Sequence, residues 1–191
     1  MQSRIKKNMK ILLCITGASG CIYGIRLLEE LKNADAEVHL IISEGAEKII
    51  TYETDFNIKD LIEMADFSYG NSDISAGPAS GSYDMDSMVI LPCSLKTLSA
   101  VANGYADTLI SRSATCILKE GKKLIIVNRE TPLDLIALKN MLSAKQAGAI
   151  ILPAMPGFYH KPRKIEDLVD FIVGKVLDQL DIENNLFKRW G

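Results

Sequence analysis

The chain has 191 residues, of which 48% are hydrophobic and 24% charged, and its formal net charge is −2. This is the balance of one globular domain, with neither a basic surface for nucleic acid nor the ~20-residue apolar run that spans a bilayer. The cysteines at 14, 21, 93 and 116 form no C-x-x-C pair and have no metal-ligand spacing to a histidine, so we expect reduced thiols in a soluble, cytoplasmic protein without a metal site.

Apolar runs alternate with stretches of helical period along the chain. Residues 1–9 are interpreted as a basic leader that is disordered, ahead of a single domain at 10–191. Strands are predicted at 10–16, 37–43, 87–92, 122–127 and 149–153, and helices at 25–33, 44–54, 94–104, 105–121, 131–148 and 164–180. Residues 53–82, rich in Gly, Ser and Asp, are predicted to be a long irregular loop. The alternation predicts an α/β, Rossmann-like fold: an open, mostly parallel sheet with helices on both faces.

Ligands of such sheets bind beyond the carboxyl ends of the strands, so the residues after each strand are the candidate site. The turn 17–19 follows the first strand and precedes a helix whose free amides favour an anion. The glycines at 17, 20 and 24 depart from the dinucleotide pattern G-x-G-x-x-G, and the second strand ends at Ser43 in place of an acidic residue. Glu44 nevertheless leaves NAD open as a ligand, and a glycine turn needed for packing alone is the other alternative.

The third and fourth predicted strands end in clusters of polar residues. Ser94, Lys96 and Thr97 suit a phosphate or the polar edge of a flavin, although ordinary helix capping explains the hydroxyls equally well. Arg129 and Glu130 follow the fourth strand, where a proline-started helix is predicted to begin. They could form a surface salt bridge, or the guanidinium could fork onto a ligand while the carboxylate moves a proton.

Two histidines carry weaker signals. His160 lies in the loop after the fifth strand, between two prolines and a glycine on one side and a proline on the other. It could act as a general base, but a structural hydrogen bond is the commoner role of a lone histidine. His39 lies in the middle of a predicted strand and is interpreted as structural.

The strand ends and their flanking segments together resemble the UbiX-type flavin prenyltransferases. The resemblance covers residues 10–190 and rests on five motifs in order: TGASGCIYGIRLL, PASGS, MVILPCSLKTLSAVANGYADTLISRSA, LKEGKKLIIVNRETPLDLIALKNM and GAIILPAMPGFYHKP. It implies the flavodoxin-like flavoprotein fold, which flavin-dependent cysteine decarboxylases share. Those decarboxylases carry an asparagine-containing motif where this chain has PCSLKT. A cysteine decarboxylase and a non-catalytic FMN-binding protein remain as alternatives.

The resemblance implies that a dimethylallyl group passes from dimethylallyl phosphate to reduced FMN, without a metal. The prenyl group bonds first to flavin N5 and then to C6, and the prenylated FMN serves a separate decarboxylase. It also implies a homododecamer whose sites are completed at subunit contacts, which would order the loop at 53–82.

The same resemblance assigns roles to particular residues. FMN is expected to be bound by Gly17, Ala18, Ser19, Ser43, Ser94, Leu95, Lys96, Thr97 and Arg129. Dimethylallyl phosphate is expected at Tyr159, Lys175 and Lys119, and the catalytic residues are expected to be Glu130, Lys119 and Ser19. Position 175 usually carries arginine in this family, and lysine keeps the charge but loses the bidentate fork. Whether the donor is the monophosphate or the diphosphate stays open.

Overall fold

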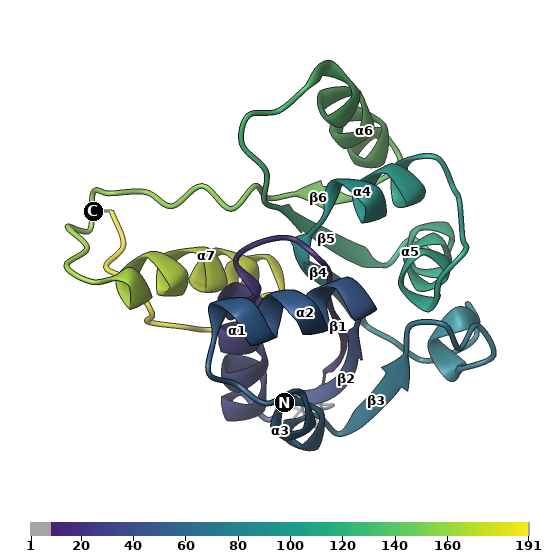
Figure 1. Cartoon of the computed structure of the whole chain (residues 1–191), viewed down its shortest axis with the longest axis horizontal. Helices are drawn as coiled ribbons and strands as arrows, with labels where there is room; N and C mark the ends of the chain where they lie inside the picture. The colour runs from purple at the N-terminus through teal and green to yellow at the C-terminus, as the bar shows by residue number, and fades with distance from the viewer. Residues whose placement is uncertain (1–8, 191) are drawn as a thin grey trace, which may run out of the picture.

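The computed structural model describes residues 9–190, so of the leader expected at 1–9 all but Met9 lies outside the described residues. Within this range the strands form one parallel sheet in the order β3-β2-β1-β4-β5-β6 (Figure 1). The strands are β1 (Lys10–Ile15), β2 (Glu37–Ile42), β3 (Phe67–Gly70), β4 (Ser87–Cys93), β5 (Lys123–Asn128) and β6 (Ile150–Ile151). This doubly wound order confirms the predicted α/β, Rossmann-like fold.

Helices cover both faces of the sheet, because the strands bury side chains on both sides. Alternate residues of β1 show this: Leu13 belongs to one apolar cluster and Leu12 to the other. The first face carries α1 (Cys21–Asn33), α2 (Glu44–Glu53), α3 (Ile58–Met64) and α7 (Ile165–Gln179). The second carries α4 (Leu95–Ala102), α5 (Leu109–Lys119) and α6 (Leu135–Gln146).

Two local predictions are wrong. The segment 53–82 is not one irregular loop, since it contains α3, the edge strand β3 and a short 3₁₀ turn at Gly77–Ala79. β3 has four largely exposed residues and pairs with β2 alone, so its sequence lacks the apolar run by which strands are recognised. The helix after β5 does not begin at Pro132, because Asp134 caps it by accepting a hydrogen bond from the Ala137 amide at 2.7 Å.

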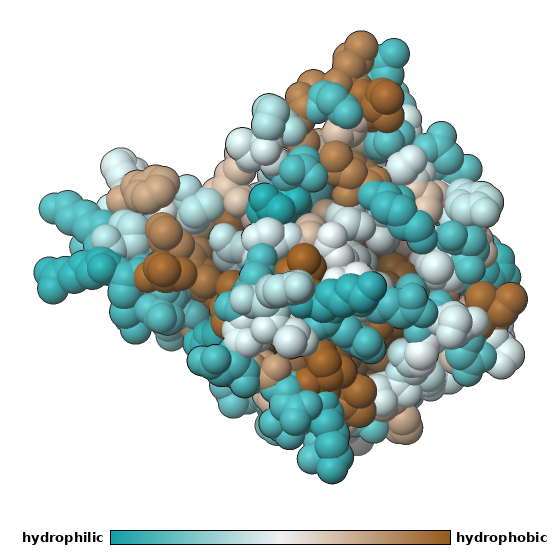
Figure 2. Space-filling view, viewed as in Figure 1, coloured by the Kyte–Doolittle hydropathy of each residue, from teal (hydrophilic) through white to brown (hydrophobic). Residues whose placement is uncertain are grey.

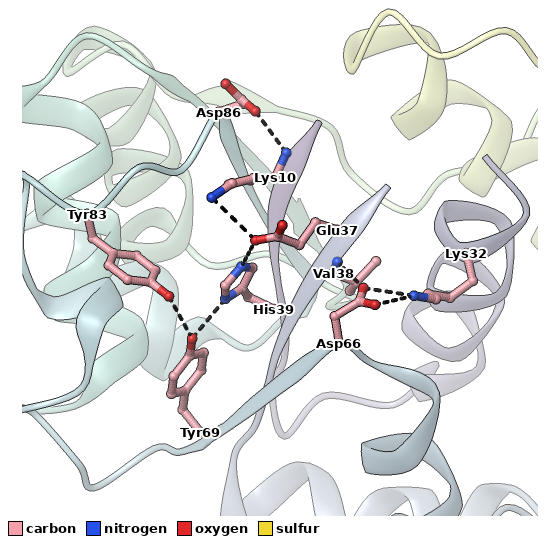
Figure 3. A network of polar contacts seen from close by, with 9 residues as sticks. All are labelled: Lys10, Lys32, Glu37, Val38, His39, Asp66, Tyr69, Tyr83 and Asp86. Atoms are coloured by element: carbon pink, nitrogen blue, oxygen red, sulfur yellow. Dashed lines mark hydrogen bonds and ion pairs between the residues drawn. The ribbon is translucent and has the colours of Figure 1, made fainter. Parts of the chain in front are cut away.

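The structural interpretation of His39 is confirmed by a buried polar network (Figure 3). Its Nε2 lies 3.0 Å from a carboxylate oxygen of Glu37, and its Nδ1 lies 2.8 Å from the Tyr69 hydroxyl, which is 3.1 Å from that of Tyr83. Burial lowers the pKa of His39, although the Glu37 carboxylate opposes the shift. The network therefore attaches the edge strand β3 and the segment before β4 to the neighbouring strand β2.

One helix presents apolar side chains on its outer surface. α6 buries Ala137, Met141 and Ala144 against the body of the protein. The exposed apolar side chains of α6 are Leu135, Ile136, Leu138 and Leu142. Figure 2 shows this apolar surface at the upper end of the molecule, over α6. An exposed apolar surface of this kind marks a region that associates with another molecule.

None of the helices formed by residues 9–190 is long and apolar enough to cross a bilayer.

Candidate functional site

The centre of the candidate site is the point where β1 and β4 lie side by side. Chain connections leave these two strands in opposite directions, which opens a crevice beyond their carboxyl ends. Thr16 joins the two strand ends: its hydroxyl donates to the Pro92 carbonyl at 2.7 Å and accepts from the Ser94 amide at 2.8 Å. The turn after β1 and the start of α4 are thereby held in a fixed relation.

A cavity of about 460 Å³ lies at this point. Five of the residues predicted to bind FMN line it, together with Gly45, Asn71, Asp107 and Thr108: Gly17, Ser43, Ser94, Lys96 and Thr97. Its volume lies in the ~300–1,000 Å³ range of small-molecule sites. The strand order therefore gathers residues predicted to bind FMN that are up to 80 positions apart in the sequence (Gly17 and Thr97).

Two serines of this cavity also cap helices, which is the alternative to ligand binding that the sequence left open at Ser94. Ser43 accepts a hydrogen bond from the Ala46 amide at 3.2 Å and starts α2. Ser94 accepts from the Thr97 amide at 3.3 Å and starts α4, with its hydroxyl 3.1 Å from that of Thr97. Helix N-termini carry partial positive charge, so α2 and α4 favour an anionic group between them.

Glycine allows a close approach of two backbones in the wall of the cavity. A Cβ atom at Gly17 would lie 3.1 Å from the carbonyl carbon of Gly45, tighter than ordinary contact. Gly20, at the end of the same turn, has φ 94°, a conformation that other residues rarely adopt. These contacts require glycine for packing, which is one of the alternatives that the sequence left open for this turn.

The free amides that the sequence predicted at the start of α1, as a site for an anion, are instead paired with a carboxylate of the protein itself. The amides of Gly20 and Cys21 donate to one carboxylate oxygen of Glu53, at 2.7 and 3.3 Å. Burial, together with this carboxylate, raises the pKa of the Cys21 thiol to about 12. Sequence reasoning missed Glu53, because nothing in an amphipathic helix end signals a contact 33 residues upstream.

Arg129 and Glu130 directly follow β5, at the carboxyl ends of the strands where the crevice lies. The Arg129 Nε donates to the Ser19 carbonyl at 3.0 Å, which joins it to the turn after β1. A carboxylate oxygen of Glu130 accepts from the Thr131 amide at 3.2 Å. Neither side chain takes part in an ion pair among residues 9–190. They therefore do not form the surface salt bridge that was one alternative from the sequence. Both line a second cavity of about 270 Å³ with Asn128, Pro153 and Met155.

Tyr159 and Lys175 belong to a separate aromatic cluster. The segment after β6 extends away from the sheet before the chain returns as α7 (Figure 1). The Tyr159 ring lies 5.8 Å from that of Phe171 and 5.4 Å from that of Trp190. Lys175 Nζ lies 5.7 Å from the centre of the Phe187 ring. Within residues 9–190, no described contact joins this cluster to Arg129 or Glu130.

His160 makes a structural contact in the same cluster. Its Nε2 lies 3.3 Å from the backbone carbonyl of Asp167, and its ring is stacked on Phe171 at 5.3 Å. These contacts favour the structural alternative over the general base.

Lys119 lies at the amino-terminal ends of the strands, opposite the carboxyl ends where the cavities lie. It ends α5, directly before β5 begins at Lys123, whereas Glu130 follows the far end of β5. The six residues of β5 span roughly 15–20 Å. Its ammonium lies 3.6 Å from the Glu120 carboxylate. A single chain therefore does not bring Lys119 to the other predicted site residues.

Comparison with known proteins extends these observations. The Flavoprotein family model matches residues 1–177. The flavin prenyltransferase UbiX of Methanocaldococcus jannaschii is 53% identical over 183 residues, which cover 96% of this chain and 99% of that protein.

Two solved structures are similar along their whole length. AnUbiX (PadA1), in complex with FMN and dimethylallyl pyrophosphate, has a TM-score of 0.95 and 43% identity, covering 97% of this chain and 98% of that one. A dodecameric FMN-dependent UbiX-like decarboxylase from Escherichia coli O157:H7 has a TM-score of 0.94 and 41% identity, covering 96% and 100%. The chain therefore belongs to the flavoprotein family and, within it, to the UbiX-type flavin prenyltransferases.

Proposed function

We propose that this protein is a flavin prenyltransferase that joins the dimethylallyl group of dimethylallyl phosphate to N5 and C6 of reduced FMN. The observation that carries the proposal is the cavity at the β1/β4 crevice, whose lining includes five residues expected to bind FMN. Family membership at 53% identity supports it, as does the likeness to a structure that holds FMN and a dimethylallyl donor.

The polar groups of the cavity fit a flavin mononucleotide. The amide ends of α2 and α4 and the hydroxyls of Ser43, Ser94 and Thr97 suit a phosphate and a ribityl chain. Leu95 is the first residue of α4, and Ala18 and Ser19 lie in the turn after β1. The reduced flavin, when bound, supplies an electron-rich ring that accepts the prenyl group. Arg129, whose Nε donates to the Ser19 carbonyl, is proposed to bind a ring carbonyl.

The remaining roles follow from the charge that develops during transfer. Breaking the allylic C–O bond leaves negative charge on the phosphate, which Tyr159, Lys175 and Lys119 are proposed to stabilise. Ring closure at C6 releases a proton, and the Glu130 carboxylate is the proposed base. Ser19 is proposed to hold the substrate beside the flavin.

A neighbouring chain is proposed to complete the site. Lys119 precedes the start of β5, whereas Glu130 follows its end. From that position Lys119 can act only on the site of another copy. The exposed apolar side chains of α6, which begins close after Glu130, supply a surface for such contacts. We propose a homododecamer, as in the E. coli relative. The product would serve a separate decarboxylase that depends on prenylated FMN.

We also propose a cytoplasmic location. All four cysteines are free and buried, and unpaired thiols persist in reducing compartments. Burial raises the pKa of Cys93 well above its usual value, which suits an inert packing role beside the site.

The reaction is tested by assaying phosphate release. With reduced FMN and dimethylallyl phosphate, we expect phosphate to appear only when both substrates are present. Phosphate release without flavin would overturn the proposal. So would the absence of phosphate release in a protein that produces CO2 from a peptidyl or pantothenoyl cysteine.

Replacing Arg129 by alanine tests flavin binding. We expect the FMN dissociation constant to rise by about tenfold, because a charge-assisted hydrogen bond to the ring and the tie to Ser19 are both lost. Titration followed by flavin fluorescence measures it, with exposed Arg163→Ala as the matched control. An unchanged dissociation constant for Arg129→Ala would remove this residue from the site.

Replacing Lys175 by arginine tests the substrate end of the site. We expect KM for dimethylallyl phosphate to fall by a few fold, because the guanidinium binds phosphate through two parallel hydrogen bonds. Measuring KM for the diphosphate donor in both proteins shows which donor each side chain suits. A KM unaffected for both donors would mean that Lys175 is a solvated lysine of α7.

A further inference from the structure

The starts of three helices meet at the cavity of the β1/β4 crevice. α2 begins at Glu44, α4 at Leu95 and α5 at Leu109, and residues at the start of each helix line the cavity. Helix N-termini carry partial positive charge and offer free amides to an anion. Lys96 adds an ammonium, which lies 3.4 Å from the Asp107 carboxylate, and Glu44 is exposed to solvent, which screens its charge.

Asn71 connects the end of β3 to the start of α5. Its backbone carbonyl accepts from the Leu109 amide at 2.8 Å, and its side-chain Oδ1 accepts from the Ile110 amide at 3.2 Å. Since a backbone amide needs an acceptor, the side-chain oxygen faces α5, and Nδ2 lies at the other end of the planar group. Nδ2 donates to no acceptor among residues 9–190, and it is not one of the fully buried side-chain atoms that lack a partner. It is therefore an accessible donor.

The side chain of Asn71 lies on the side of the β1/β4 cavity. Asn71 lines both this cavity and a neighbouring one of about 310 Å³, so it forms part of the wall between them. Ile110, whose amide the Asn71 oxygen covers, lines the first cavity and not the second. The side-chain amide is thus held against the part of the wall that belongs to the β1/β4 cavity.

The order of the strands decides which end of a flavin nucleotide faces Asn71. Asn71 follows β3 and Arg129 follows β5, with β2, β1 and β4 between them. Neighbouring strands are ~4.8 Å apart, so the two residues lie on opposite sides of the crevice, roughly 20 Å from each other. Arg129 is the residue proposed to bind a ring carbonyl. An elongated nucleotide across the crevice then has its phosphate on the side of Asn71.

We propose that Asn71 Nδ2 donates a hydrogen bond to the phosphate of FMN, and that Asn71 is a specificity-determining residue that favours FMN over riboflavin. The inference rests on the proposed function, which requires FMN in this cavity. Ionised phosphate oxygens accept hydrogen bonds, so they suit the amide nitrogen and not the amide oxygen. The two ends of one side chain then serve two partners, the start of α5 and the ligand.

The test changes the charge of one atom pair in the protein and removes the phosphate from the ligand. Asn71→Asp keeps an acceptor for the Ile110 amide but replaces the donor by a negatively charged oxygen. We expect its FMN dissociation constant to rise by at least about tenfold, because a hydrogen bond to a charged group is replaced by repulsion. Riboflavin, which lacks the phosphate, should bind this variant and the wild-type protein within about twofold of each other. Titration followed by flavin fluorescence measures both.

Asn57→Asp is the matched control. Asn57 also accepts from a backbone amide at a helix start, that of Lys59 at 3.1 Å, but it does not line the β1/β4 cavity. This variant undergoes the same chemical change away from the site, and it should keep the wild-type affinity for both flavins.

The thermal midpoint provides an independent readout. Unliganded Asn71→Asp should melt at or above the wild-type temperature, because a carboxylate at a helix N-terminus is favourable, while the FMN-induced rise in Tm should shrink. Asn71→Ser serves if the aspartate variant does not fold. It removes the amide donor without adding charge, and it should weaken FMN binding and leave riboflavin binding unchanged.

The outcomes separate this inference from the function on which it rests. A wild-type protein that binds neither flavin overturns both. If the wild-type protein binds FMN, three results overturn the role of Asn71 and leave the prenyltransferase proposal standing. These are unchanged FMN affinity in Asn71→Asp, an equal loss of affinity for FMN and riboflavin in that variant, or the same loss of FMN affinity in Asn57→Asp.

Discussion

Glu130→Gln is expected to lower the turnover number by about 100-fold or more while leaving FMN affinity unchanged. A positioned general base contributes ~10²–10⁴-fold, and glutamine keeps the shape of the side chain but does not take a proton. Its contact with the Thr131 amide survives, because the amide oxygen of glutamine accepts in the same way. The fold around the cavity should therefore be preserved.

The measurement is single-turnover formation of prenylated flavin, beside an FMN titration. Glu183→Gln, an exposed change in the C-terminal segment, is the control and should match the wild-type rate. A Glu130→Gln enzyme within about twofold of wild type would remove proton transfer by this residue from the mechanism, since a general base contributes far more.

Mixed oligomers of Lys119→Ala and Glu130→Gln chains are expected to regain activity that neither variant has alone. Each variant lacks one essential group, and within one chain the two groups lie at opposite ends of β5. If a site takes Glu130 from one chain and Lys119 from its neighbour, random co-assembly gives intact sites in about a quarter of positions. Activity near that fraction of wild type is the expected result.

A second mixture distinguishes shared sites from sites within one chain. Co-assembling the double variant with wild-type chains gives about a quarter of intact sites if they are shared, but about a half if each chain holds its own. Sites within one chain also predict no recovery in the first mixture. No recovery there, with about half activity in the second, would contradict the shared site.

The fold was largely predictable because its strands are buried on both faces. β1, β2, β4 and β5 are continuous apolar runs, and short turns connect them to amphipathic helices. β3 was missed because an exposed edge strand needs no apolar run, and the buried network around His39, not the composition of β3, attaches it to the sheet. A tertiary contact of this kind has no local signature in the sequence.

The residues of the candidate site were likewise predictable only where their position depends on a strand and not on packing between distant segments. Ser43, Ser94 and Arg129 follow strands, so the rule that ligands bind at the carboxyl ends of strands finds them. Glu53 reaches the start of α1 from the end of another helix, and Asn71 enters the cavity from the missed segment. Both depend on packing between distant segments. Lys119 shows a further limit, since its proposed partner is a residue of another chain.

The central claim is tested most directly by the mass of the flavin after turnover. The protein is incubated without oxygen with reduced FMN and dimethylallyl phosphate, and the flavin is released and measured by mass spectrometry. A flavin heavier by one five-carbon prenyl unit, absent without the protein, is the predicted result. Unmodified FMN from a preparation that binds it, with the monophosphate and the diphosphate both tried, would contradict the proposed function.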